Sequence, residues 1–226
     1  LATATGADAG SAATGVPLED DLAVTTKVAT ATAIGYAVGA DAKTIAAAIN
    51  TAASNIGITA TATNSATLGN LASAGTLSMT LNGSSVSAVV TDKSDLSSFA
   101  AAINGLQSTT GVTASFATPG DKSVITLSTT DGRDITVVDF NNTGATKTAD
   151  IVAGTTTTTL TGGAATDSTT ITGTIELASS AGQITAGNAN ASVFGTSVSA
   201  FNSVATLDLL SATNSQAALK TLDAAL

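Results

Sequence analysis

Apolar residues recur at helical spacing in two stretches of the chain that align without a gap at an offset of 54 residues. The first, DAKTIAAAINTAASNIGITATA, spans residues 41–62, and the second, DLSSFAAAINGLQSTTGVTASF, spans residues 95–116. Ten of the 22 aligned positions are identical. The apolar positions that define one helical face are Leu96, Phe99, Ile103 and Leu106 in the second copy, and Ala42, Ile45, Ile49 and Ala52 in the first. Each copy therefore predicts a short helix.

Both copies also carry the signals that begin and end a helix. Asp41 and Asp95 stand where an N-cap belongs, because their carboxylates can accept hydrogen bonds from the free amides of the first turn. Gly57 and Gly111 then interrupt the pattern, and an alternating strand follows each glycine. The repeated unit is thus predicted as helix followed by strand.

Alternating segments surround the second copy. Ahead of it, residues 77–81 and 86–90 alternate on either side of Asn82-Gly83, and this dipeptide suits a two-residue hairpin turn with two positive φ angles. After it, strands are predicted at residues 112–117, 124–128 and 135–140, separated by turns at Pro119-Gly120-Asp121 and Asp131-Gly132. This module is predicted as β-β-α-β-β-β.

The first copy lacks such a continuation, but TIELASSAGQITAG at residues 174–187 matches ITLSTTDGRDITVV of the second module with one residue deleted. An unpaired strand edge in the first module would be prone to association, so the chain has a physical reason to return to it. We therefore expect the second module to be inserted in the first. The threonine-rich residues 141–170, including five threonines at 155–159, are predicted as strand flanked by loops.

The expected fold class is α+β, mainly β, with two similar β-rich modules that each hold one short helix, and a C-terminal helix. The expected domains are an N-terminal loop at 1–21, a discontinuous inner domain at 22–70 and 146–200, an outer inserted domain at 71–145, and a helix start at 201–226. Within the last segment Leu219, Leu222 and Leu226 share one face.

Composition excludes several classes of function. The chain has 226 residues, of which 43% are hydrophobic, 3% aromatic and 10% charged, and its net charge is −9. Seven basic residues cannot supply the clustered cations that nucleic acids or anionic membranes require. No apolar run approaches the roughly 20 residues of a membrane-spanning helix. We expect neither nucleic-acid nor membrane binding.

Candidate chemistry is sparse. The chain has no cysteine and no histidine, which removes thiol nucleophiles, imidazole bases and the usual zinc ligands. No glycine-rich phosphate loop precedes a helix. Asp131 and Asp134 are interpreted as a hairpin tip, with a surface cation site as the alternative, and the acidic run Glu19–Asp20–Asp21 as a solvated loop. No catalytic, cofactor-binding or metal-binding residue is predicted, and the protein is expected not to be an enzyme.

The two blocks resemble the hook "IN" motif of bacterial flagellins, at Ile49-Asn50 and Ile103-Asn104, as do the flanking TLSMTLNG and ITLSTTDGRDITV. The stretch VATLDLLSATNSQAALKTLDAAL at residues 204–226 is similar to the start of the C-terminal conserved region of that family, although Leu209-Leu210 stands where a β-branched residue and Ser or Thr are commoner. The resemblance covers residues 22–140 and 171–226. It implies a secreted structural subunit of the extracellular flagellar filament, with other flagellin subunits as partners.

Under that resemblance the chain is expected to be an excised, outward-facing variable part of a flagellin, monomeric because the assembling terminal helices are absent. A bacterial surface adhesin-like module that binds glycans or host proteins is the alternative. Serine and threonine hydroxyls are also compatible with O-linked sugars. The sequence that flanks this chain in its gene would discriminate between the two: long amphipathic helices favour the filament subunit, and a signal peptide with a cell-surface anchor favours the adhesin.

Overall fold

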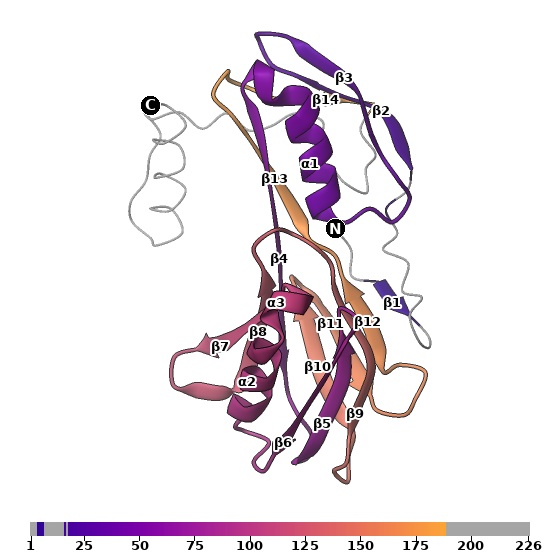
Figure 1. Cartoon of the computed structure of the whole chain (residues 1–226), viewed down its shortest axis with the longest axis vertical. Helices are drawn as coiled ribbons and strands as arrows, with labels where there is room; N and C mark the ends of the chain where they lie inside the picture. Colours follow the sequence, from indigo (N-terminus) through magenta and orange to yellow (C-terminus); the bar gives the residue numbers. More distant parts are fainter. Residues whose placement is uncertain (1–3, 7–15, 17, 189–226) are drawn as a thin grey trace. The chain divides into compact units, whose positions relative to one another are not determined.

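The computed structural model describes residues 4–6, 16 and 18–188 (Figure 1). The described chain is mainly antiparallel β-strand with a few short helices, which is the α+β, mainly β class expected from the sequence. The described residues form two compact units. Unit 1 comprises residues 4–6, 16, 39–44 and 62–175, and unit 2 comprises residues 18–38, 45–61 and 176–188.

Unit 1 contains two antiparallel sheets and a short helical segment. Its elements are β1 (Ala4–Gly6), β5 (Gly75–Leu81), β6 (Ser84–Val90), α2 (Ser97–Gly105), α3 (Gln107–Thr110), β7 (Thr113–Thr118), β8 (Asp121–Thr129), β9 (Ile135–Asn142), β10 (Thr148–Ala153), β11 (Thr156–Thr161) and β12 (Ser168–Ile171). One sheet has the order β1-β12-β9-β5-β6, and the other has the order β11-β10-β4-β8-β7. The strand β4 (Ile58–Gly69) contributes its second half to this unit.

A single hydrophobic core joins the inner faces of both sheets to α2. Leu77 and Phe140 come from the first sheet, Leu68 and Leu127 from the second, and Phe99 from the helix; all five side chains are fully buried. Strand alternation explains this division, because successive side chains point to opposite faces and one face of each sheet is apolar. Phe99 and Phe140 are the two aromatic side chains of this core, and its other members are smaller or aliphatic.

Unit 2 repeats this arrangement with fewer strands. Its elements are β2 (Glu19–Thr25), β3 (Thr30–Tyr36), most of α1 (Ala42–Ala53), a 3-10 turn (Ser54–Ile56), the first part of β4, most of β13 (Thr174–Ser179) and β14 (Thr185–Gly187). The sheet order β14-β2-β3 corresponds to β9-β5-β6 of unit 1, and the pairing of β13 with β4 corresponds to the pairing of β8 with β7. The predicted β-β-α-β-β-β succession is therefore present in both copies.

The bounds of the units differ from those expected from the sequence. Residues 62–70 and 146–175 belong to unit 1 and not to the inner domain, so this unit is longer than the expected 71–145. The reason is strand pairing: β10 pairs with β4 through Ile151 opposite Leu68, and β12 pairs with β9 through Thr169 opposite Val137. The threonine-rich passage thus extends both sheets of unit 1, as strands β10, β11 and β12.

The N-terminal expectation is also corrected where the chain is described. Residues 1–21 were expected to form a loop, but Ala4–Gly6 pairs with β12 and Glu19 begins β2. The expected helix start at 201–226 lies outside the described residues. Among the described residues no helix is long and apolar enough to cross a membrane.

Candidate functional site

The repeated helices bury the same positions in both units. Ala42, Ile45, Ala46 and Ile49 of α1 are at most 5% exposed, and the residues 54 positions later, Leu96, Phe99, Ala100 and Ile103, are at most 6% exposed. Asp41 directly precedes α1 and accepts a hydrogen bond from the Thr44 amide, as expected of an N-cap. The N-cap of α2 is Leu96 and not the predicted Asp95, which lies one position earlier and accepts a hydrogen bond from the Ser97 amide. The predicted helical face is confirmed, except that Ala52 and Leu106 are only partly buried.

The asparagine of each Ile-Asn pair fastens its helix to the following strand. Asn50 donates its side-chain amide to the Ala60 carbonyl at 2.8 Å and accepts the Ala60 amide at 2.7 Å. Asn104 makes the same pair of bonds to Ala114, with the same two distances. A primary amide is suited to this task because it carries a donor and an acceptor side by side, as a backbone peptide does. We call these two pairs the asparagine clamps.

The clamps explain why Ile and Asn are adjacent in the repeat. Ile49 and Ile103 are fully buried beneath their helices. The asparagine that follows each isoleucine hydrogen-bonds to the strand residue ten positions later. Sequence comparison of the two copies singled out the Ile-Asn pair but assigned no contact to the asparagine. The sequence did contain a signal for this contact: in both copies an alanine of the following strand lies ten positions after the asparagine.

Replacing a clamp asparagine by alanine is expected to destabilise its unit. Asn50→Ala and Asn104→Ala each remove two hydrogen bonds to one buried alanine, so each should lower the free energy of unfolding by about 1–3 kcal/mol. Urea denaturation measures the effect. Asn55→Ala is the matched control, because Asn55 is exposed in the 3-10 turn. Equal stabilities for the Asn55→Ala and Asn104→Ala variants would show that the clamps contribute nothing.

Unit 1 also contains an open cleft of about 590 Å³. It is lined by Asp41, Lys43, Asn82, Gly83, Arg133, Asp134 and Thr136. These residues come from the start of α1, the β5–β6 turn, the connection between β8 and β9, and the beginning of β9. The cleft therefore includes Arg133 and Asp134 from the segment that the sequence interpreted as a hairpin tip.

The interpretation of this segment as a hairpin tip is wrong. The strand before it, β8, pairs with β4 and β7, whereas the strand after it, β9, pairs with β5 and β12. The segment thus carries the chain from one sheet to the other. A two-stranded hairpin and a turn between sheets share the same Asp-Gly signal, and only the choice of strand partner separates them.

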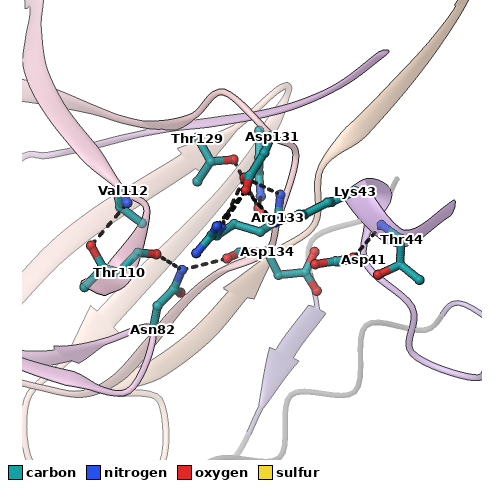
Figure 2. Close-up of polar contacts among 11 residues, drawn as sticks. Asp41, Lys43, Thr44, Asn82, Thr110, Val112, Thr129, Asp131, Arg133 and Asp134 are labelled. Carbon is teal, nitrogen blue, oxygen red and sulfur yellow. Dashed lines mark hydrogen bonds and ion pairs between the residues drawn. The ribbon is translucent and has the colours of Figure 1, made fainter. Parts of the chain in front are cut away.

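Asp131 is neutralised by two cations. Arg133 donates two hydrogen bonds to its Oδ2 atom from Nε and Nη2, at 3.0 and 2.7 Å, and Lys43 Nζ lies 2.9 Å from the same atom (Figure 2). The guanidinium of Arg133, followed by the ammonium of Lys43, holds the pKa of Asp131 well below its usual range despite partial burial. Asp131 is therefore a permanent anion that fixes the connection, and it is not a proton donor.

Asp134 has the opposite character. Burial, and next the negative charge of Asp41, raise the pKa of Asp134 to about 6, while a hydrogen bond from the Gly173 backbone lowers it. Its Oδ1 atom is buried and has no hydrogen-bond partner among the described residues. Asn82 fixes the backbone around it, since its side-chain amide donates to the carbonyls of Thr110 and Asp134 and accepts from the Thr136 amide.

The raised pKa of Asp134 predicts a pH-dependent stability. Because its folded pKa of about 6 exceeds the ordinary value of 3.8, the folded state binds more protons between these two values, and stability falls as the pH rises through that window. Relative to Asp134→Asn, the wild type should lose on the order of 1–2 kcal/mol between about pH 4 and pH 7, after allowance for partial exposure. Urea unfolding at a series of pH values measures this loss.

Asp41→Asn is the companion variant for this experiment. It keeps an oxygen to accept the Thr44 amide but removes the charge that faces Asp134, so the pH dependence should shrink. A wild-type stability that rises relative to Asp134→Asn across the same window would contradict the assignment.

The chemistry available in this cleft is limited. Both cations that line it, Lys43 and Arg133, are engaged by Asp131, and the remaining carboxylates of Asp41 and Asp134 repel each other. Neither contacts a hydroxyl nucleophile in the described structure. Comparison of the chain with protein-family models and with curated proteins finds no match.

Proposed function

We propose that this chain forms outward-facing, variable domains of a subunit of the bacterial flagellar filament and serves motility as a structural protein. The observation that carries the proposal is the Ile-Asn block, present twice and resembling the hook motif of flagellins. Both copies place the asparagine in the same two-bond clamp, with a buried isoleucine before it. A motif that fastens a helix to a strand is a packing device, which suits a structural module better than a reactive site.

The surface of unit 1 supports a solvent-facing role. The outer positions of its second sheet are hydroxyl side chains, such as Thr63 and Ser65 of β4 and Thr157 and Thr159 of β11, and all four are exposed. Hydroxyl groups are well hydrated without creating the strong single-sign field that draws other molecules nonspecifically. Such a face suits a domain held in water at the outside of a filament, where other subunits are the partners and no catalytic step is assigned.

Immunogold labelling of the source bacterium tests the proposal. Antibodies raised against this chain should decorate isolated flagellar filaments along their length, and disruption of the gene should abolish or shorten the filaments and stop swimming. Label confined to the cell wall or outer membrane, with normal swimming of the disrupted strain, would overturn the filament assignment. If adhesion is lost under those conditions, the adhesin-like alternative would stand.

A further inference from the structure

Three consecutive acidic residues converge at the start of β2 in unit 2. Regular strand alternation would send neighbouring side chains to opposite faces. A bulge changes this: Glu19 lies opposite Tyr36 and Leu22 opposite Ile34, so three steps on β2 match two on β3. Within the bulge the amides of Asp20 and Asp21 both donate to Glu19 Oε1, at 3.1 and 3.2 Å.

The bulge brings three carboxylates within reach of one ion. One carboxylate oxygen from each of Glu19, Asp20 and Asp21 lies within 4.8 Å of the other two. Asp20 and Asp21 are exposed, so an ion can reach their carboxylates from solvent. Glu19 is only 6% exposed and lies on the buried side of the cluster. The interpretation of this run as a solvated loop is wrong, because the three acids lie in β2, with Glu19 paired to Tyr36 and the other two in the bulge.

No described basic residue balances these charges. The ion pairs of the described chain join Lys43 and Arg133 to Asp131, and Lys122 to Asp95, all in unit 1. Three carboxylates of adjacent residues, with one oxygen of each within 4.8 Å of the others, repel one another, and a bound cation would relieve this repulsion.

A second, independent feature points to a ligand. Tyr36 is directly across the strand pair from Glu19, so both side chains share a face, and Tyr36 is only 6% exposed. Its hydroxyl is buried without a hydrogen-bond partner among the described residues. Buried hydroxyls normally have a partner, and an ordered water is the usual one when protein groups are absent.

We infer that Glu19, Asp20 and Asp21 bind one Ca²⁺ ion, and that Tyr36 accepts a hydrogen bond from a water molecule carried by the ion. Ca²⁺ takes six to eight oxygen ligands in flexible geometry, so three carboxylates on adjacent residues and several waters satisfy it. Mg²⁺ requires near-ideal octahedral geometry and binds such irregular sites less well. The site lies entirely in unit 2 and does not depend on the proposed flagellar function.

The composition of the chain provides a direct spectroscopic test. The chain contains one tyrosine and no tryptophan, so excitation of the tyrosine band can sensitise Tb³⁺, a Ca²⁺ analogue, only when the ion lies close to Tyr36. The full chain should show saturable Tb³⁺ luminescence that excess Ca²⁺ removes and equal Mg²⁺ does not. Absence of sensitised luminescence, or equal displacement by both ions, would overturn the inference.

Calorimetric titration with CaCl₂ separates this site from general attraction to an acidic protein. The double variant Asp20→Asn/Asp21→Asn should bind Ca²⁺ at least tenfold more weakly, and Tyr36→Phe a few-fold more weakly. Asp139→Asn is the single-charge control, since Asp139 is exposed in unit 1 and its positive φ of 54° suits asparagine. Circular dichroism checks that each variant is folded.

The control also defines failure. Asp139→Asn should keep wild-type Ca²⁺ affinity, and Asp21→Asn alone should weaken it by more than Asp139→Asn does. Equal losses in these two single variants would show that net charge, and not the bulge, attracts the ion. Unchanged Ca²⁺ affinity in the folded double variant would likewise exclude the site.

Discussion

Phe99→Ala is expected to lower the free energy of unfolding of unit 1 by about 4 kcal/mol, the usual range for deleting a buried phenylalanine being 3–5. Phe99 is fully buried in the one core that joins both sheets to α2. Aromatic residues are only 3% of the chain, so few neighbouring side chains are large enough to fill the cavity. Most of the cavity term should therefore remain after relaxation.

The repeat supplies a matched experiment in unit 2. Ile45 occupies the position equivalent to Phe99, 54 residues earlier, and is also fully buried. Ile45→Ala removes fewer atoms and should cost about 3 kcal/mol. Urea denaturation followed by circular dichroism measures both variants, with Val89→Ala, at a 62% exposed position of β6, as the surface control. Equal effects at Val89 and Phe99 would contradict the assignment of the core.

Local features of the fold could be predicted from the sequence because short-range chemistry determines them. The Asn82-Gly83 turn is an example: its φ angles are 45° and 81°, and Leu81 pairs with Ser84 across it, as a two-residue hairpin turn requires. Gly57 and Gly111 similarly adopt left-handed conformations after the two helical segments. In each case the turn needs a positive φ angle, and glycine or asparagine at that position adopts it, so a few adjacent residues suffice for the prediction.

Strand partners could not be predicted with the same success. The β-branched threonines predict a strand within residues 141–170. The pairing of β11 with β10, and of β10 with β4, depends instead on which sheet edges remain open. The same limit caused the hairpin interpretation of Asp131 and Asp134. The pattern of a strand indicates which side chains face the core, but it does not indicate which strand it pairs with. The observed bounds of the units therefore differ from the expected ones, because they depend on strand pairing.

The candidate sites were missed for a related reason. The bulge at Glu19 arises from a one-residue mismatch between β2 and β3, and no local pattern in the acidic run reports it. The raised pKa of Asp134 depends first on burial and then on the charge of Asp41, which is 93 positions earlier in the chain. The clamps were the exception that sequence could have revealed, because Asn50 and Asn104 recur with their alanine partners inside the repeated block.

Gly132→Ala is expected to be among the most damaging single substitutions in unit 1. Gly132 has a φ of +74°, and a Cβ atom there would collide with the Ala62 side chain and lie 2.7 Å from the Ala62 carbonyl carbon. Two costs therefore add: left-handed strain of about 1–2 kcal/mol, and overpacking of about 1–3 kcal/mol against strand backbone that cannot rotate away. A total loss of about 3 kcal/mol or more follows, since the pairing of β4 with β8 begins two residues after Ala62, at Asn64, and restrains the strand there.

Gly154→Ala isolates the strain from the collision. Gly154 has a φ of +59° in the turn between β10 and β11, and a Cβ atom there would have no neighbour within 4 Å. This variant should lose only the left-handed strain, about 1–2 kcal/mol. The difference between the two variants in urea denaturation measures how firmly the β8–β9 connection is pressed onto β4. If Gly132→Ala is no less stable than Gly154→Ala, Ala62 yields easily, and the connection that positions Asp131 and Asp134 is not rigidly held by β4.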